Sequence, residues 1–313
     1  MNSLPAAFVE RLEEIIPQEH FQTVLKSFSE GRVLSVRINT LKIPKDSLLE
    51  ILRKRNINFS GISWCPDALI LHNIILRELT EDDLVKGGLV YPQSLASMLV
   101  PLILEPKPDE RILDMCAAPG SKATQMAGLM RNQGEIVCVE NIRKRFFKLK
   151  SVISILGAEN IRCHCLDGRR YNGGKFDKIL VDAPCSAEGM FSALNPKTYF
   201  YWSLRKIKEM RKKQKGLLWQ AARLLKPGGT LLYSTCTFSP EENEAVVDWV
   251  LKKTKGELKL VPVFIEGIAS YPSFLSWGGK SFSDELKYSL RILPNEGMDG
   301  FFIAKMIKGE GIL

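Results

Sequence analysis

The sequence predicts an α/β protein, a doubly wound parallel sheet preceded by a smaller α+β domain. The main observation is that apolar, strand-like runs and helical segments alternate regularly between about residues 93 and 253. Such alternation is typical of a parallel sheet with helices on both faces. Before residue 92 the short helices and strands do not alternate in this way. We therefore predict an accessory domain at residues 1–92 and a main domain at residues 93–313.

The accessory domain mixes two kinds of pattern. Leu4–Ile16 and Ser47–Arg55 show the apolar spacing of amphipathic helices, whereas Val33–Ile38 and Ala68–Leu71 are short apolar runs that predict strands. The mixture indicates an α+β arrangement.

The main domain follows a regular order. Its expected helices lie at residues 93–103, 121–130, 143–156, 203–225 and 240–253. Its expected strands lie at residues 111–114, 135–139, 161–165, 178–182 and 229–236. A last strand at residues 300–305 is expected to complete the edge of the sheet.

Composition narrows the function. The 313 residues carry a net charge of +9, which favours a polyanionic partner such as nucleic acid. Seven cysteines form no regular disulfide pattern, and only three histidines occur, so we expect a reduced, cytoplasmic protein without metal. Acidic residues within the first 20 positions do not fit a signal peptide, and no apolar stretch is long enough to cross a membrane. We expect a monomer.

The first strand of the main domain ends in a turn that suits a nucleoside ligand. The turn is Asp114-Met-Cys-Ala-Ala-Pro-Gly-Ser-Lys122, and it runs directly into a helix. Gly120 allows close approach of a ligand to the backbone. The pattern G-x-G-x-x-G is absent, which argues against a dinucleotide but not against S-adenosyl-L-methionine, because that cofactor carries no phosphate.

Acidic residues follow the next two strands. Glu140 can accept hydrogen bonds from both ribose hydroxyls, and Asp167 can accept one from an adenine amino group. The alternative is that both are helix caps or solvated loop residues.

Two cysteines come at the ends of two strand-like runs, Cys185 after Asp182-Ala-Pro and Cys236 after Ser234-Thr. Carboxyl ends of adjacent parallel strands line one crevice, so both thiols are expected beside Asp182. A thiolate that attacks carbon 6 of cytosine makes carbon 5 nucleophilic, and an acid near nitrogen 3 stabilises the developing charge. Either cysteine is a candidate nucleophile on these grounds. The alternative is that both are small buried apolar residues.

Several segments resemble the Sun-type RNA (cytosine-5)-methyltransferase family, closest to its bacterial RsmF-like ribosomal RNA branch. They cover nearly the whole chain: Ser35-Val-Arg-Ile-Asn-Thr-Leu-Lys42, Tyr91-Pro-Gln-Ser94, the turn at 114–122, Asp182-Ala-Pro-Cys-Ser186, Ser234-Thr-Cys-Thr237 with Glu241-Glu-Asn243, and Asp299-Gly-Phe-Phe-Ile-Ala304. The resemblance implies a Rossmann-like methyltransferase sheet and the cofactor S-adenosyl-L-methionine.

The resemblance also implies roles that spacing does not assign. Cys236 would attack carbon 6, and Cys185 would resolve the adduct and release the product, with Asp182 as the third catalytic residue. The expected cofactor-binding residues are Cys116, Ala117, Ala118, Pro119, Gly120, Ser121, Lys122, Glu140, Asp167 and Asp182. Ribosomal RNA is the first expected substrate and transfer RNA the second.

A basic helix supports an RNA partner. Residues 205–215 hold seven lysines and arginines and one glutamate, and Tyr199-Phe-Tyr-Trp202 precedes them. The cations can neutralise phosphates, and the aromatic side chains can stack on unpaired bases. The alternatives are a solvated helix face and core aromatics.

Three other functions compete with cytosine-5 methylation. Methylation of an exocyclic amine usually needs a second proline and an aromatic residue after Asp182, and this chain lacks both. A catalytically silent RNA-binding or ribosome-assembly protein would have no use for the two thiols. A redox protein with a Cys185–Cys236 disulfide is the third alternative.

Overall fold

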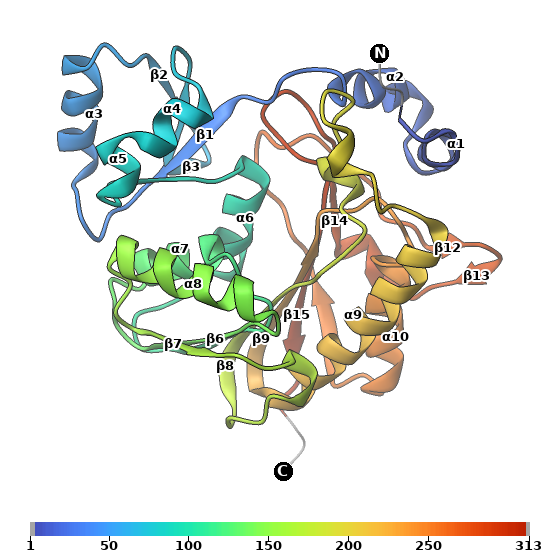
Figure 1. Ribbon diagram of the computed structural model, residues 1–313. Helices are drawn as coiled ribbons and strands as arrows, with labels where there is room; N and C mark the ends of the chain where they lie inside the picture. Colours follow the sequence, from blue (N-terminus) through green and yellow to red (C-terminus); the bar gives the residue numbers. More distant parts are fainter. Residues whose placement is uncertain (1–3, 311–313) are drawn as a thin grey trace.

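The computed structural model describes residues 4–310 and shows a central mixed sheet with helices on both faces and a separate small lobe beside it (Figure 1). The strand order of the central sheet is β11-β14-β15-β9-β8-β5-β6-β7, with β10 paired to β15. The parallel strands are β5 (Arg111–Asp114), β6 (Glu135–Val139), β7 (Ile161–His164), β8 (Phe176–Asp182) and β9 (Leu225–Thr235). The Rossmann-like sheet predicted from the sequence is therefore confirmed.

The last strand differs from expectation in its place. β15 (Phe301–Lys308) does not end the sheet but lies antiparallel between β9 and β14 (Leu290–Ile292). Its residues Phe301 to Ala304 are buried, because both its neighbours are strands and helices cover both faces. The remaining strands on this side are β10 (Leu258–Val261) and β11 (Ser270–Tyr271), and β12 (Ser276–Trp277) pairs with β13 (Lys280–Ser281).

Successive side chains of a strand point to opposite faces of the sheet, so each face is covered by its own layer of helices. In β8, Leu180 belongs to one apolar cluster, whereas Ile179 and Val181 belong to the other. The first cluster holds α6 (Leu95–Leu104), α7 (Ser121–Leu129) and α8 (Arg143–Leu156). The second holds α9 (Leu204–Leu224) and α10 (Glu244–Lys253). Residues 240–243 form a turn, so α10 begins later than the expected residue 240.

The small lobe is a four-stranded antiparallel sheet covered by three helices. Its strand order is β2-β3-β1-β4. The strands are β1 (Leu34–Ile38), β2 (Phe59–Ile62), β3 (Cys65–Leu71) and β4 (Val90–Pro92), and the helices are α3 (Lys45–Lys54), α4 (Leu76–Glu81) and α5 (Asp83–Lys86).

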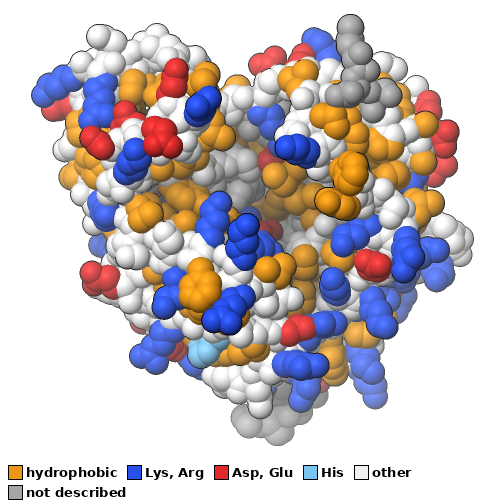
Figure 2. All heavy atoms as spheres, in the orientation of Figure 1, with side chains coloured by type: hydrophobic (Ala, Val, Ile, Leu, Met, Phe, Trp, Pro, Cys, Tyr) orange, Lys and Arg blue, Asp and Glu red, His pale blue; other side chains and the backbone are white. Residues whose placement is uncertain are grey.

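The first two helices do not pack in that lobe. α1 (Ala6–Ile15) and α2 (Gln18–Ser27) lie above the loops of the central sheet (Figure 1), and a cleft separates them from the small lobe (Figure 2). Their apolar faces join a cluster with Phe191, Phe238 and Leu293. The linker after α2 therefore crosses from one side of the cleft to the other. Among residues 4–310 no helix has the length and apolar character needed to span a membrane.

Candidate active site

A cavity of about 310 Å³ lies at the carboxyl ends of the parallel strands. Its wall comes from the turns that follow β5, β6, β7, β8 and β9, and from α9. It includes the predicted residues Cys116, Ala118, Glu140, Asp167, Asp182, Cys185 and Cys236. Parallel strands bring their carboxyl ends to one edge of the sheet, which explains why segments 120 residues apart meet there.

Two free thiols face each other in this cavity. Cys185 Sγ and Cys236 Sγ are 3.4 Å apart, and neither forms a disulfide. The contact with Cys236, together with burial, raises the pKa of Cys185 well above its ordinary value. Cys185 is therefore held as a thiol in contact with a second sulfur.

A buried carboxyl group holds the loop that carries Cys185. Glu242 accepts hydrogen bonds from the backbone N–H of Ser186 at 3.1 Å and from Gln214 Nε2 at 2.8 Å, and it also contacts Ser186 Oγ. Gln214 donates a further hydrogen bond to the carbonyl of Pro184 at 3.0 Å. Burial raises the pKa of Glu242 to about 8.

A second buried glutamate joins the two cysteine loops. Glu188 Oε2 accepts hydrogen bonds from Thr237 Oγ1 at 2.7 Å and from the Phe238 backbone at 3.1 Å. Thr237 Oγ1 is in turn 2.7 Å from Ser186 Oγ. Ser186, which follows Cys185, is thus hydrogen-bonded to Thr237, which follows Cys236. This hydrogen bond helps to set the distance between the two thiols.

Asp182 is held by neighbours on both of its oxygens. Oδ1 accepts a hydrogen bond from Ser234 Oγ at 2.8 Å, and Oδ2 forms an ion pair with Lys122 Nζ at 2.8 Å. Lys122 also donates to Ser97 Oγ at 2.9 Å. Behind this pair, burial and the charge of Asp182 raise the pKa of Asp114 to about 7.

The predicted cofactor turn forms one wall of the cavity. Cys116 and Ala118 line the cavity, whereas Ala117, Pro119, Gly120 and Ser121 shape the turn behind that lining. Gly120 has φ = 113°, and a Cβ there would come within 3.0 Å of the Leu149 side chain in α8. Glycine is therefore required for the turn to approach α8 this closely.

The two predicted ribose and adenine ligands lie in the same cavity but in different surroundings. Glu140 is buried, accepts a hydrogen bond from the Ile142 N–H at 2.8 Å, and pairs with Arg145 at 3.4 Å. Asp167 caps the short helix η1 (Gly168–Arg170), and hydrogen bonds from Arg169 lower its pKa. Both the ligand and the capping interpretations of Asp167 fit this geometry.

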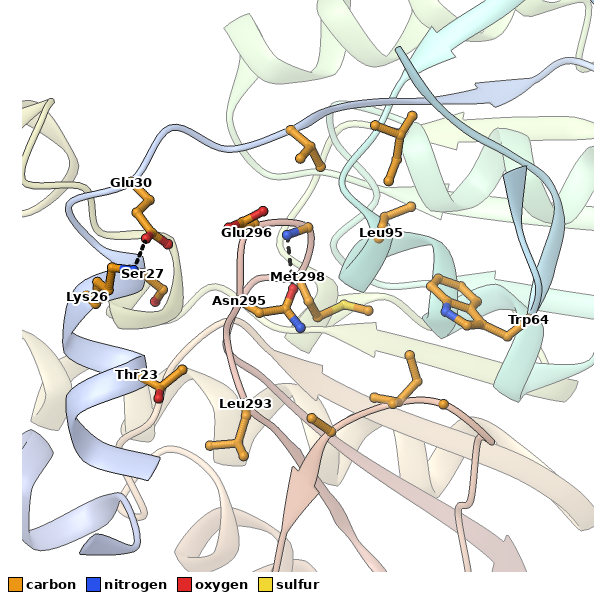
Figure 3. Close-up of a pocket in the computed structure, with 16 residues that line it drawn as sticks. Thr23, Lys26, Ser27, Glu30, Trp64, Leu95, Leu293, Asn295, Glu296 and Met298 are labelled. Atoms are coloured by element: carbon orange, nitrogen blue, oxygen red, sulfur yellow. Dashed lines mark hydrogen bonds and ion pairs between the residues drawn. The ribbon is translucent and has the colours of Figure 1, made fainter. Parts of the chain in front are cut away.

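A larger cavity of about 540 Å³ lies elsewhere, between α2, the β2–β3 turn, α6 and the loops before β11 and β15. Figure 3 shows Trp64, Leu95 and Met298 along its apolar side and the Lys26–Glu30 ion pair at its rim. None of the predicted catalytic or cofactor residues lines it.

Sequence reasoning did not assign roles to several residues of the site. Glu188 and Glu242 are buried beneath the cysteine loops, and Arg32 pairs with Asp299 and donates to the Gly189 carbonyl at 3.0 Å. Glu242 belongs to the motif Pro240-Glu-Glu-Asn243, which could have indicated that this glutamate has a role in the site. No local pattern could have indicated the role of Arg32, because its partners are more than 150 residues away in the sequence.

Two family models match the chain. A model described as 16S rRNA methyltransferase RsmB/F matches residues 101–307, and one for the N-terminal domain of 16S rRNA methyltransferase RsmF matches residues 4–95. The motifs that line the cavity all lie within the first of these two matches.

Curated relatives include enzymes for two kinds of RNA. A tRNA (cytosine(49)-C(5))-methyltransferase of Pyrococcus abyssi is 38% identical over 281 residues, which are 88% of this chain and 88% of that protein. A ribosomal RNA small subunit methyltransferase F of Escherichia coli is 32% identical over 322 residues, covering 98% of this chain and 64% of that protein. The chain thus spans slightly less than two thirds of the Escherichia coli relative.

Solved structures show the same architecture. A methyltransferase homolog protein from Pyrococcus horikoshii has a TM-score of 0.79 and 30% identity, covering 97% of this chain and all of that chain. The NSun6 protein from Pyrococcus horikoshii with SFG has a TM-score of 0.82 and 25% identity, covering 98% and 99% of the two chains. Family models, relatives and structures agree, and the chain belongs to the RsmB/F family of RNA cytosine-5 methyltransferases.

Proposed function

We propose that this protein uses S-adenosyl-L-methionine to form 5-methylcytosine in RNA through a covalent bond between Cys236 and cytosine carbon 6. The observation that carries the proposal is the pair of thiols 3.4 Å apart in one cavity with Asp182. Asp182 is fixed by Ser234 and Lys122, so the three predicted catalytic side chains form one preorganised group.

The cavity suits S-adenosyl-L-methionine. Glu140 provides carboxylate oxygens for ribose hydroxyls, and the turn at 116–120 presents backbone close to the ligand. Asp167 can accept from an adenine amino group, although Arg169 contacts it in the structure. The solved relative that contains SFG, an analogue of this cofactor, supports the assignment. The bound cofactor supplies an electrophilic methyl group for cytosine carbon 5.

The first step assigned to the protein is attack by the Cys236 thiolate on carbon 6. A sulfur–carbon bond forms, and an electron pair moves through the ring towards nitrogen 3. We assign the Asp182–Lys122 pair to the place where that charge would develop, with Asp182 beside nitrogen 3 and the exocyclic amine. The Lys122 ammonium group offsets the negative charge of the Asp182 carboxylate and so favours negative charge on the ring.

Cys185 is assigned the removal of the proton from carbon 5. In the free protein its pKa is raised chiefly by contact with Cys236. Once the Cys236 sulfur is bonded to carbon 6, that cause is removed, so Cys185 becomes easier to deprotonate. Cys185 passes its own proton to solvent and, as a thiolate, accepts the carbon 5 proton, after which the bond between sulfur and carbon 6 breaks and Cys236 leaves as a thiolate.

We propose 16S ribosomal RNA as the substrate and transfer RNA as the alternative. The RsmF models over both parts of the chain favour the ribosomal substrate. The Pyrococcus abyssi relative favours transfer RNA and has the higher identity. Mapping of 5-methylcytosine in both RNA pools after incubation with the protein decides between them.

We further propose that residues 1–92 form an RNA-binding accessory domain and that residues 93–313 form the methyltransferase domain. The lobe of β1–β4 and the helices α1 and α2 lie on opposite sides of a cleft above the central sheet (Figure 2). Lysine and arginine side chains gather at the foot of this cleft over α8 and α9 (Figure 2). RNA that enters the cleft would contact both parts of the chain.

The decisive experiment uses labelled cofactor, total RNA and three proteins. Wild type is expected to transfer the methyl group, and Cys236→Ala is expected to be inactive. Cys185→Ala is expected to accumulate a protein–RNA adduct that survives denaturation, since it forms the bond but does not release it. Full methyl transfer by Cys236→Ala contradicts the mechanism. RNA binding by wild type without any methyl transfer would instead support the silent RNA-binding alternative.

A further inference from the structure

The aromatic run before α9 separates into two inward and two outward side chains. The Tyr199 ring packs 5.7 Å from that of Phe191, and Trp202 packs 5.7 Å from Phe8 of α1. Phe200 and Tyr201 point away from the protein, with 74% and 81% of their surfaces exposed. Their rings contact each other edge to face at 4.9 Å. The outward pair is therefore held on a segment whose other two aromatic rings are packed.

We propose that Phe200 and Tyr201 form a platform on which unpaired bases a few nucleotides from the target cytosine stack. The platform would make single-stranded RNA the preferred form of the substrate at this position. This inference rests on the proposed function, because it assigns the RNA strand a path next to the same catalytic cavity.

Hydrogen bonds connect the segment that carries the platform to the catalytic loops. Trp202 Nε1 donates a hydrogen bond to Glu188 Oε1 at 2.8 Å, and the other oxygen of Glu188 accepts from Thr237, the residue after Cys236. Lys213, nine residues into α9 from Leu204, lines the catalytic cavity. At about 1.5 Å per helical residue, the platform end of α9 is roughly 14 Å from that point, a span of a few stacked nucleotides.

The charges around the platform are those that RNA requires. α9 buries Ile207, Met210 and Gln214 and turns its basic residues outward. Within the described chain, Lys208, Lys212 and Lys213 make no ion pair, whereas Glu209 pairs with Arg205 and Lys206. Unpaired cations beside the platform can take phosphates of the strand whose bases stack on the rings.

The exposure of this pair is unusual for a folded surface. Single exposed apolar residues are common on folded surfaces. Here the two rings are exposed together with Met190, Leu194 and Leu204, which flank the aromatic run in the sequence. Figure 2 shows hydrophobic side chains together at the rim of the cleft over the segment before α9. An aromatic patch within a basic surface fits single-stranded nucleic acid, since every base has a face that can stack.

The test measures binding of a single-stranded RNA oligonucleotide with 2-aminopurine about four nucleotides to each side of one cytosine, without cofactor. Replacement of both rings, Phe200→Leu with Tyr201→Leu, keeps apolar side chains but removes the stacking faces. The dissociation constant is expected to rise at least ~10-fold, and the quenching of 2-aminopurine on binding is expected to disappear. The slope of the logarithm of the binding constant against the logarithm of the salt concentration should stay unchanged, because no cation is removed.

Two control proteins make the result specific. Phe264→Leu changes a phenylalanine that is 85% exposed on another surface, and its binding should equal that of wild type. Lys208→Gln with Lys212→Gln should reduce the slope of log K against log salt concentration by about 1.4 while the quenching remains. A fully paired duplex of the same sequence should bind wild type and the leucine variant equally.

Unchanged affinity and quenching in the leucine variant would overturn the platform, as would an equal loss in Phe264→Leu. Neither result depends on chemistry at Cys236. Failure of wild type to methylate any RNA would instead overturn the proposed function, whatever the binding data show. The two failures are therefore distinguishable.

Discussion

Lys122 Nζ lies 2.8 Å from Asp182 Oδ2, so the predicted cofactor turn and the predicted catalytic aspartate form an ion pair. Lys122 is the second residue of α7, directly after the turn at 116–120, whereas Asp182 is the last residue of β8. The ammonium group also stands near Asp114 and opposes the rise in the pKa of that carboxyl group. The Lys122 ammonium group thus interacts with both Asp182 and Asp114 at the edge of the sheet where the cysteines lie.

Replacement of Lys122 with methionine should therefore slow methyl transfer. The variant loses the charge that stabilises the developing negative charge on the ring, an effect on the order of 100-fold in rate. Single-turnover methyl transfer and the rate of adduct formation in the Cys185→Ala background measure the loss. Lys259→Met, which removes an exposed lysine of β10, is the control. A Lys122→Met rate within twofold of wild type would show that the ion pair has no catalytic role.

The raised pKa of Glu242 predicts a pH dependence of stability. The folded chain retains the proton up to about pH 8, whereas the unfolded chain loses it near the ordinary value of 4.5. The stabilisation from this group is therefore complete below pH 4.5 and is lost as the pH rises through 8. The free energy of unfolding should fall between pH 5 and 8, on the order of 4 kcal/mol at most from this residue.

Glu242→Gln isolates that contribution, because the amide cannot ionise. Urea denaturation at pH 5, 6, 7 and 8 should give a shallower decline for Glu242→Gln than for wild type. Asp114 contributes a decline of the same sign between about pH 4 and 7 in both proteins, so only the difference is assigned to Glu242. Glu266→Gln, on the exposed surface, should reproduce the wild-type profile. Parallel profiles for Glu242→Gln and wild type would refute the assignment.

Gly189 sets how closely the Cys185 loop approaches the rest of the site. A Cβ at this position would lie 2.0 Å from the carbonyl oxygen of Gly300, which is backbone and cannot rotate away. Gly189→Ala should displace the loop and move Cys185 from Cys236. Misplacement of about 1 Å at a reacting centre can reduce the rate on the order of 100-fold.

Gly31→Ala is the matched control for that change, since nothing lies within 4 Å of a Cβ at Gly31. Methyl transfer and thermal unfolding should be measured for both variants. The expected result is a large loss of activity for Gly189→Ala and almost none for Gly31→Ala. Equal activity of the two alanine variants would show that the loop tolerates the displacement.

Arg291 and Glu244 form a buried ion pair that holds the antiparallel side of the sheet to α10. Arg291 Nε and Nη2 donate to the two Glu244 oxygens at 2.5 and 2.6 Å, and Nη1 donates to the Phe238 carbonyl at 2.9 Å. Arg291→Met leaves the glutamate buried and unpaired, so the free energy of unfolding should fall by about 3–5 kcal/mol. Urea denaturation measures the change.

The double variant Arg291→Met with Glu244→Gln removes the uncompensated charge and should recover part of that loss. Recovery is the specific sign of a charge effect, because loss of packing by Arg291 is common to both variants. A single variant that loses less than about 1 kcal/mol would mean that the pair does not stabilise the fold.

Most of the central sheet could be predicted, since the order of its strands along the chain is a local property. Apolar runs such as those of β5 and β6 are bounded by turns and helices, and the structure places them at the expected residues. The meeting of Cys185, Cys236 and Asp182 could also be predicted, because parallel strands end at one edge. The position of β15 could not, since an apolar strand pairs equally well at an edge or inside a sheet.

Sequence alone determined the fold class, the likeness to the family and the set of side chains at the carboxyl ends of the strands, because these depend on pattern and order. Tertiary structure decided which of the four aromatic residues before α9 face outward. It also decided that Glu188 and Glu242 hold the two cysteine loops together, and that Lys122 forms an ion pair with Asp182. Each of these depends on contacts between residues far apart in the chain, and burial by a distant partner leaves no local pattern to read.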